Sequence, residues 1–557
     1  MCGIYGYIGR NSINEVMGGL KRLEYRGYDS AGIAFIGDNL DCEYADNNEH
    51  IKRFKNLTVI KSEGQMSCLE EVINKCLPIG DIAIGHTRWA THGKPSVANA
   101  HPHISKNGKW VIVHNGIIEN FEELKKQFSP KRFVSDTDSE VVAHLLEKYY
   151  DGSALSTLNK VCRMIKGSFA LAVLTTYEKD KVFVAKYGSP VVVGCDEEAG
   201  VVCSDLNSVK VGKCAFILED NQFAVVEKGN VSVYDENLKP KKLKNMADCH
   251  REERGNLGNY SHFMLKEIDE IPRAITRTIE QYNSYEKMRT VLPLNVVRKI
   301  KKILIIGCGT AYHAGLIGKR LFEEIGIKSE VEIASEFRYN TFIPEKNTLA
   351  IFVSQSGETA DTIKALSKCK ENNLLTLAMT NVKNSSICFV ADRVIYTSAG
   401  AEIGVASTKA YNSQVALFYL ISSYFKSVLD DNAKDFDREV VKLLDVAKVI
   451  SHNKIKPICQ KVADEIYQSK SIYMIGRGLD YDLAREASLK LKEISYIHCE
   501  AYPAGELKHG TISLIDDKTF VFSFITQKMV KDKTQSSEKE ISARGGKIIK
   551  LTQFEEN

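Results

Sequence analysis

The sequence contains no long apolar run and carries little net charge. A membrane-spanning helix needs about 18 or more consecutive apolar residues, and no stretch of the chain reaches that length. The first residues also lack the apolar segment of a signal peptide. The 75 basic residues are nearly balanced by 71 acidic ones, which leaves a net charge of +4. A charge this small gives no indication of binding to nucleic acid or to a membrane surface.

Cysteine pairs at metal-binding spacing are also missing. The 14 cysteines are scattered, with no Cys-x-x-Cys pair and no histidine-rich segment to accompany one. This distribution is typical of reduced thiols and argues against a disulfide framework or a zinc site. We therefore expect a cytoplasmic protein without a metal site. Its 557 residues leave room for several domains.

Two kinds of local pattern divide the chain. Residues up to about 240 hold short β-type runs punctuated by Gly, Asn and Asp, with helical stretches near Ile13–Leu23 and Ser139–Lys148. This half predicts an α+β domain with antiparallel sheets. A polar, basic segment around Pro240 precedes a helical stretch near Phe263–Arg277. From Ile303 the order strand, glycine turn, helix repeats, which predicts a parallel, doubly wound α/β arrangement.

The α/β half also repeats internally. Lys301–Ile325 aligns without gaps on Lys470–Ile494, and Thr348–Val353 later matches Thr519–Phe524. Matching segments in the same order predict two copies of one subdomain, of which the second is shorter and incomplete. We accordingly predict a domain at 2–240, a linker with a connecting helix at 241–290, a first α/β subdomain at 291–430 and a second at 460–557.

Cys2 directly follows the initiator Met. If Met1 is removed, one residue carries both a thiol and a free α-amine. The amine has an ordinary pKa near ~8 and the thiol one near ~8.5, so Cys2 can supply a nucleophile together with its proton acceptor. The alternative is a small residue placed after Met by chance.

Polar loops in the first domain supply possible partners for Cys2. The guanidinium of Arg88, in the loop HTRWATHG, could hold an α-carboxylate through two hydrogen bonds. The side-chain amide of Asn115 and the backbone N–H of Gly116 suit an oxyanion hole, although Asn-Gly is also a common hairpin turn. Asp138 could bind an ammonium group or serve only as a helix cap.

Two segments of the α/β half carry further candidate groups. Ser354–Thr359 follows a predicted strand, and its hydroxyls at a helix start could form a phosphate site without lysine, or could merely cap the helix. The second copy has Ile525–Lys528 at the matching place, so we expect one such site per chain. Glu486, Lys490 and Glu493 share one face of a predicted helix, either as site residues or as a solvated charged surface.

The first-domain motifs MCGI, LEYRGYDSAG, HTRWATHG, AHPH, HNGIIEN and SDTDSEV resemble those of the class II, N-terminal-nucleophile glutamine amidotransferases. The resemblance implies that Cys2 is the nucleophile and that Asn115 and Gly116 form the oxyanion hole. It implies that Trp89 gates the passage of ammonia. The residues that it assigns to glutamine binding, Trp89 included, are Arg26, Arg88, Trp89, Thr91, His92 and Asp138.

The second half, with SQSGET, GCGTAYHAG and GVASTKA, resembles two tandem sugar-isomerase (SIS) phosphosugar-binding domains. The resemblance implies that Glu493 shuttles a proton between two sugar carbons, that His509 assists ring opening, and that Glu486 and Lys490 support the site. The residues that it assigns to the sugar phosphate are Thr310, Ser354, Gln355, Ser356, Thr359, Val405 and Ser407.

The two halves together resemble the amidotransferases that convert L-glutamine and D-fructose 6-phosphate into L-glutamate and D-glucosamine 6-phosphate. That resemblance implies a homodimer that needs no cofactor. Relatives continue into a tail with a Schiff-base lysine, whereas this sequence ends at Asn557. We therefore expect a fragment or a truncated product that keeps glutaminase activity and makes the amino sugar poorly. Two other functions remain open: an amidotransferase of another branch, and a non-catalytic phosphosugar sensor.

Overall fold

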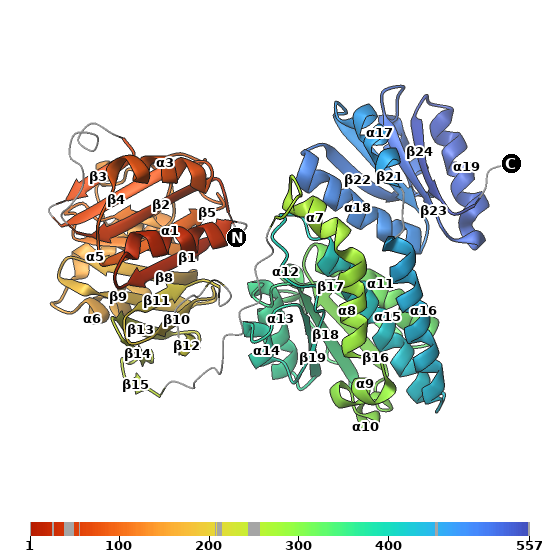
Figure 1. Cartoon of the computed structure of the whole chain (residues 1–557), viewed down its shortest axis with the longest axis horizontal. Coiled ribbons are helices and arrows are strands. Elements are labelled where there is room, and N and C mark those ends of the chain that lie inside the picture. The colour runs from red at the N-terminus through yellow and green to blue at the C-terminus, as the bar shows by residue number, and fades with distance from the viewer. Residues whose placement is uncertain are drawn as a thin grey trace. The chain divides into compact units, whose positions relative to one another are not determined.

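The computed structural model describes residues 2–24, 27–37, 49–54, 56–205, 208, 214–242, 257–451 and 455–554. It divides the chain into two compact units, Met1–Glu252 and Glu253–Asn557. We call them the N-terminal unit and the C-terminal unit and describe each by itself (Figure 1). No helix among these described ranges is long and apolar enough to cross a membrane.

The N-terminal unit contains two antiparallel sheets. The first has the strand order β12-β10-β11-β1-β5-β2-β4-β3. Its strands are β1 (Gly3–Ile8), β2 (Ser30–Ile36), β3 (Ile51–Phe54), β4 (Leu57–Glu63), β5 (Ile82–Arg88), β10 (Val192–Cys195), β11 (Gly200–Cys203) and β12 (Cys214–Ile217). The second has the order β15-β14-β13-β9-β8-β7-β6. Its strands are β6 (His103–Ile104), β7 (Trp110–Ile118), β8 (Gly167–Thr175), β9 (Glu178–Tyr187), β13 (Gln222–Glu227), β14 (Asn230–Tyr234) and β15 (Pro240–Lys241).

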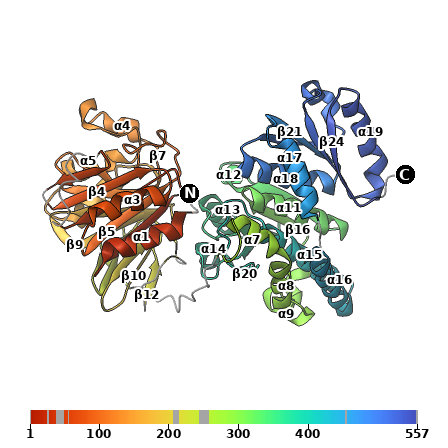
Figure 2. The same ribbon diagram turned by 45° about the horizontal axis from the view of Figure 1, so that its top comes forward.

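Helices cover the outer face of each of these sheets. They are α1 (Ser12–Leu23), α3 (Met66–Cys76), α4 (Phe121–Lys125), α5 (Glu140–Tyr149) and α6 (Ala154–Cys162). One buried core, which includes Ile84 and Val113, lies between the two sheets. A second core joins α1 and α3 to the first sheet, and a third joins α5 and α6 to the second sheet. The unit is therefore layered helix, sheet, sheet, helix, which confirms the predicted α+β fold of antiparallel sheets (Figure 2).

The C-terminal unit begins with four short helices and continues with two parallel sheets. The first sheet has the order β17-β16-β18-β19-β20 and the second the order β22-β21-β23-β24. The helices and strands up to the end of the first sheet are α7 (Phe263–Asp269), α8 (Ile271–Gln281), α9 (Tyr285–Val291), α10 (Leu294–Val297), β16 (Lys302–Gly307), α11 (Thr310–Glu324), β17 (Lys328–Ile333), α12 (Ala334–Phe337), β18 (Thr348–Ser354), α13 (Ala360–Glu371), β19 (Leu375–Thr380), α14 (Ser386–Val390) and β20 (Arg393–Tyr396). Those that follow are α15 (Lys409–Leu429), α16 (Ala433–Ser451), α17 (Lys456–Ile466), β21 (Ser471–Gly476), α18 (Leu479–Ser495), β22 (His498–Pro503), β23 (Phe520–Ile525), α19 (Lys531–Ser542) and β24 (Lys547–Thr552).

The two parallel sheets confirm the internal repeat. The matched segments Thr348–Val353 and Thr519–Phe524 fall in β18 and β23, which hold the same place in the two sheets. The described part of the second sheet has four strands where the first sheet has five. The stretch predicted as one helix near Phe263–Arg277 is instead α7 followed by α8. Pro272 stands at the start of α8, where its missing N–H costs nothing and its ring favours a new helix start.

The predicted domain boundaries stay predictions. Of the predicted linker and connecting helix at 241–290, residues 243–256 lie outside the described residues.

Candidate active sites

Cys2 lies just before β1, beside the end of β5. The antiparallel register pairs Gly3 with Thr87, which brings Cys2 next to the residues that follow Thr87. The Trp89 backbone N–H donates a hydrogen bond to the Cys2 Sγ at 3.3 Å, and the thiol lies 3.5 Å from the Trp89 carbonyl oxygen. The Trp89 ring is 42% exposed and packs edge-on against Tyr28. The sheet therefore presents the thiol at the point where the Arg88–Gly93 loop begins.

Asn115 reaches the same place from the other sheet. Its Nδ2 donates to the Cys2 carbonyl oxygen at 3.1 Å, and since an amide nitrogen has two hydrogens, one hydrogen remains for a ligand. Asn115 and Gly116 lie inside β7, in register with Ala170 and Phe169 of β8. The alternative of a hairpin turn is therefore wrong at this Asn-Gly pair.

Gly116 has a backbone conformation and a contact that only glycine tolerates. Its φ is +133°, which side chains rarely adopt. A Cβ at this position would lie 2.0 Å from the Ser168 carbonyl oxygen. The close approach of β8 therefore requires glycine next to Asn115.

His86 orients the Asn115 amide, and the sequence predictions did not include it. Its Nε2 lies 3.0 Å from both the Asn115 Oδ1 and the His114 carbonyl oxygen. Both of these atoms are acceptors, so Nε2 carries the hydrogen. Burial lowers the pKa of His86 to about 3, so the ring is neutral. His86 opens the HTRWATHG motif, which was the available signal in the sequence.

Arg88 ends β5 and is buried. Its Nη2 donates to the His92 carbonyl oxygen and, at 3.0 Å, to the Gly93 carbonyl oxygen. Its Nη1 is buried and has no hydrogen-bond partner among the described residues. Burial lowers the pKa of Arg88, while the charges of Cys2, Asp29 and Asp138 raise it. The Arg88 Nη1 is thus free to donate to a ligand, and the guanidinium interacts electrostatically with Cys2 and Asp138.

Asp138 lies before α5 and does not serve as its cap. Ser139 takes the N-cap position, and the Asp138 Oδ2 accepts the backbone N–H of Ile118 at 2.7 Å. The Ser139 hydroxyl donates to the other carboxylate oxygen at 3.2 Å. Since a carboxylate has about four acceptor positions, it keeps further capacity for an ammonium group.

Of the remaining residues predicted to bind glutamine, two lie on the loop after Arg88 and one lies outside the described residues. Thr91 and His92 lie on the loop after Arg88, with the Thr91 hydroxyl 3.3 Å from the His92 Nδ1. The His92 ring packs edge-on against Phe121. Arg26 lies outside the described residues.

In the C-terminal unit, the turn Ser354–Thr359 lies at the carboxyl end of β18. The Ser354 Oγ accepts the Gly357 N–H at 3.0 Å and lies 3.1 Å from the Thr359 Oγ1. The Ser356 Oγ accepts the Glu358 N–H at 3.2 Å. The Ser354 and Ser356 oxygens thus accept backbone N–H groups within the turn, and one O–H of the Ser354–Thr359 pair is used between them. The Ser356 O–H and the other O–H of that pair remain able to donate to an anion.

Two predicted sugar-phosphate residues lie on another loop. Val405 is 58% exposed, and the Ser407 hydroxyl donates to Glu402 at 2.8 Å. The Gln355 carbonyl oxygen accepts the Asn381 N–H at 3.1 Å, which ties the turn after β18 to the end of β19.

Helix α18 brings its charged residues against α11 of the first copy. The Glu486 Oε1 accepts from the Thr310 hydroxyl at 3.0 Å, and its Oε2 lies 2.6 Å from the His313 Nδ1. The Lys490 Nζ donates to the Thr310 hydroxyl at 2.9 Å and to Glu493 at 2.6 Å. The two views of the chain also show α11 and α18 side by side. This face of α18 is therefore not merely a solvated charged surface.

His509 is placed apart from that cluster in the described contacts. It ends a short 3-10 helix, Leu507–His509, and is exposed. Its backbone N–H donates to the Glu506 carbonyl oxygen at 2.9 Å.

The chain matches two known domain families. Residues 86–210 match the glutamine amidotransferase domain family, and residues 297–423 and 465–557 match the SIS domain family. A glutamine–fructose-6-phosphate aminotransferase (isomerizing) of Clostridium tetani is 42% identical over 99% of this chain and 90% of its own length. The chain belongs to this aminotransferase family. A relative with the same name from Caldanaerobacter subterraneus shows the same identity and coverage.

A solved structure supports the fold of the C-terminal half of this family member. It is the C-terminal domain of glucosamine-fructose-6-phosphate aminotransferase from Francisella tularensis, with a TM-score of 0.50 and 36% identity. The match covers 54% of this chain and 86% of that one. Together with the two SIS matches, it confirms tandem SIS subdomains.

In the second SIS subdomain, a side chain of the protein itself occupies the turn that corresponds to Ser354–Thr359 of the first subdomain. The Asp480 carboxylate is fully buried and accepts from the Thr526 N–H at 3.0 Å and from the Thr526 hydroxyl. The Gln527 Oε1 accepts the Leu479 N–H at 3.1 Å. A carboxylate of this chain therefore uses the Thr526 donors that an anion would need.

Proposed function

We propose that this family member hydrolyses L-glutamine at its N-terminal unit and uses the ammonia to convert D-fructose 6-phosphate into D-glucosamine 6-phosphate. One observation carries the proposal: the Cys2 thiol lies against the Trp89 N–H, next to an Asn115 amide that His86 has already oriented. Each of these groups has a defined task in the cleavage of an amide.

In the first step, the Cys2 sulfur attacks the carboxamide carbon of glutamine. After removal of Met1, the α-amine of Cys2 would take the thiol proton and pass it to the departing ammonia. The negative oxygen would be held by the Asn115 Nδ2 and the Gly116 N–H. Arg88 would bind the α-carboxylate with its free Nη1, and Asp138 would bind the ammonium group. Water then releases glutamate from the thioester.

In the second step, the sugar phosphate would bind at the hydroxyl-rich turn Ser354–Thr359. Ammonia would condense with the C2 carbonyl of the open sugar and release water, and Glu493 would then move a proton from C1 to C2 of the resulting imine, with Lys490 and Glu486 holding its position. Asp480 occupies the equivalent turn of the second copy, which supports one sugar-phosphate site per chain. We further propose that the enzyme is a cytoplasmic homodimer whose product enters amino-sugar synthesis, and that His509 acts in ring opening.

The experiment incubates the purified chain with L-glutamine, with and without D-fructose 6-phosphate. Glutamate and glucosamine 6-phosphate are measured separately. We expect both products, and we expect Cys2→Ala to abolish glutamate release. Formation of glutamate with little or no glucosamine 6-phosphate would instead favour the alternative expected from the sequence, a chain that acts as a glutaminase and makes the amino sugar poorly. A lack of both products, with binding of fructose 6-phosphate, would favour a phosphosugar sensor.

A further inference from the structure

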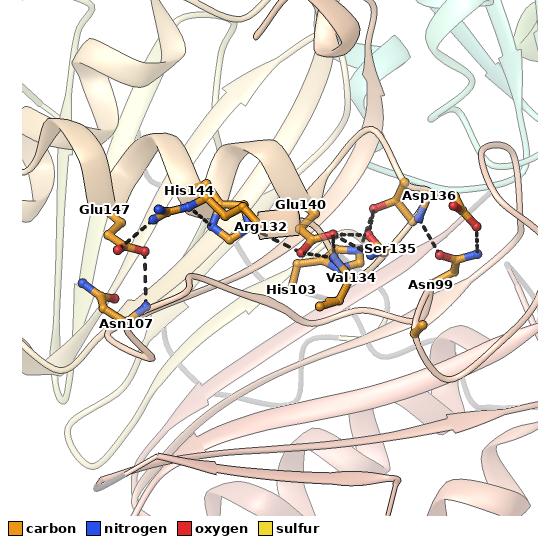
Figure 3. A network of polar contacts seen from close by, with 12 residues as sticks. Asn99, His103, Asn107, Arg132, Val134, Ser135, Asp136, Glu140, His144 and Glu147 are labelled. Atoms are coloured by element: carbon orange, nitrogen blue, oxygen red, sulfur yellow. Dashed lines mark hydrogen bonds and ion pairs between the residues drawn. The ribbon is translucent and has the colours of Figure 1, made fainter. Parts of the chain in front are cut away.

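Asn99 connects the two loops that carry the proposed glutamine-binding groups. One is the Arg88 loop (Arg88–Asn99), and the other is the Asp138 loop (Phe133–Ser139). The Asn99 side chain is 2% exposed. Its Oδ1 accepts the Asp136 N–H at 2.8 Å, and its Nδ2 donates to the Asp136 carboxylate at 3.3 Å (Figure 3). The Nδ2 also donates to the Lys94 carbonyl oxygen at 3.0 Å. Both ends of the amide are therefore in use.

The Arg88 loop is packed directly onto this amide. Gly93 has φ +76°, and a Cβ there would lie 2.7 Å from the Asn99 Nδ2. The Gly93 carbonyl oxygen accepts from the Arg88 Nη2 at 3.0 Å. A continuous set of contacts thus runs from the Arg88 guanidinium through Gly93 and Asn99 to Asp136, two residues before Asp138.

Glu140 holds the Asp138 loop from its other side. Its carboxylate accepts the N–H groups of Val134 at 3.0 Å and Ser135 at 2.8 Å, and the Ser135 hydroxyl at 2.6 Å (Figure 3). Burial raises the pKa of Glu140, but the hydrogen bonds from His144, Ser135 and Val134 outweigh burial and lower it overall. Glu140 therefore fixes the loop to α5, whereas Asn99 fixes it to the Arg88 loop.

We propose that Asn99 is a positioning residue that sets the spacing between Arg88 and Asp138. The inference rests on the proposed function, in which these two side chains bind the carboxylate and the ammonium group of glutamine. Both groups sit on one carbon of the substrate, so their partners must keep a fixed separation. Asparagine suits the task because it offers an acceptor and two donors at once. In Asn99→Asp, a carboxylate oxygen would replace the NH₂ group and face the Lys94 carbonyl oxygen and the Asp136 carboxylate. Two donated hydrogen bonds would be lost, and acceptor atoms would face one another in their place.

The test compares Asn99→Asp with Asn107→Asp in glutamine hydrolysis. At Asn107 the side-chain oxygen accepts from the Ser105 hydroxyl at 2.7 Å and from the Lys109 N–H at 3.0 Å, a role that aspartate keeps. We expect Asn99→Asp to raise KM for glutamine about tenfold with kcat within about threefold, and Asn107→Asp to change neither. Adding Asp136→Asn to Asn99→Asp should lower KM again, because the new amide can donate to the new carboxylate.

Asp136→Ala provides a second variant in case Asn99→Asp does not fold. Asp136 is exposed, and this change removes only the acceptor of the 3.3 Å bond, so we expect KM to rise about threefold with an unchanged melting temperature. An unchanged KM in Asn99→Asp and Asp136→Ala, or an equal rise in Asn107→Asp, would overturn the role of Asn99. Failure of the unmodified enzyme to hydrolyse glutamine would instead overturn the proposed function, so the two failures are distinguishable.

Discussion

At the scale of single residues, Gly116 combines a backbone conformation that only glycine tolerates with a proposed role as an oxyanion-hole donor. We predict that Gly116→Ala lowers kcat/KM for glutamine hydrolysis at least about 100-fold, because the added Cβ would meet the Ser168 oxygen and shift an oxyanion donor. Stopped assays of glutamate release measure the effect.

Gly152 provides the matched control for this substitution. Its φ is +99°, but a Cβ there would meet nothing within 4 Å. Gly152→Ala therefore imposes backbone strain without a clash and should leave glutamine hydrolysis unchanged. Equal losses in the two variants would show that strain, rather than the approach of β8, makes glycine necessary.

The Cys2 thiol should be protonated at neutral pH. Burial raises its pKa, and the Trp89 N–H, the charge of the N-terminal amine and the charge of Arg88 only partly oppose that effect. We therefore predict that alkylation of Cys2 by iodoacetamide keeps accelerating as pH rises above the ordinary thiol value of ~8.5. Mass spectrometry of the N-terminal peptide gives the rate, with the exposed Cys68 as a reference for the reagent. A plateau already at pH 7 would contradict the raised pKa.

His86 shows what the sequence could and could not reveal at this scale. Cys2, Arg88, Asn115 and Asp138 were predicted because each has a side chain whose chemistry matches a step of amide cleavage. His86 acts only by orienting Asn115, and that role depends on which strands face each other across the two sheets. The pairing of distant strands could not be derived from a local motif.

At the scale of elements, helices α11 and α18 join the two SIS copies through a polar contact. The Glu486 carboxylate is buried and lies 2.6 Å from His313. We predict that His313→Ala lowers the free energy of unfolding of the C-terminal unit by about 1–3 kcal/mol, because it removes a partner from a buried carboxylate. Urea unfolding of His313→Ala, Glu486→Gln and the double variant gives the coupling energy between the two side chains.

An exposed ion pair on the same helix is the control. Lys319 and Glu323 of α11 are 2.7 Å apart, and their side chains are 35% and 42% exposed, against 13% for His313 and 7% for Glu486. Lys319→Ala should change the free energy of unfolding by less than about 0.5 kcal/mol. A coupling energy near zero for His313 and Glu486 would mean that their contact contributes no more than this surface pair.

The sequence predicted the presence of helices and strands better than it predicted where one helix ends and the next begins. The apolar run Thr348–Val353 correctly indicated strand β18, and the repeat correctly predicted two parallel sheets of matching order. The division between α7 and α8 was missed because both segments have helical periodicity and only Pro272 marks the boundary. A hairpin turn was the alternative at Asn115-Gly116, and pairing with β8 excludes it by keeping both residues in a strand.

At the scale of the whole molecule, the two compact units divide the proposed reaction between them. Cys2 and the groups around it all belong to the N-terminal unit, whereas Ser354, Glu486 and Glu493 belong to the C-terminal unit. This division was predictable from the sequence because the change from β-rich to alternating α/β pattern is sharp. The exact domain boundaries stay predictions, because a linker has no periodicity to mark its ends.

The division predicts that the two activities can be removed separately. Cys2→Ala should abolish glutamate release while fructose 6-phosphate still binds, because no residue of the Ser354–Thr359 turn is altered. Glu493→Gln should keep glutamine hydrolysis while amino-sugar formation falls at least about 100-fold, because the amide cannot shuttle the proton. Calorimetric titration with fructose 6-phosphate and separate assays of glutamate and glucosamine 6-phosphate measure each half. Loss of sugar binding in Cys2→Ala, or full amino-sugar synthesis by Glu493→Gln, would contradict the assignment of one chemical task to each unit.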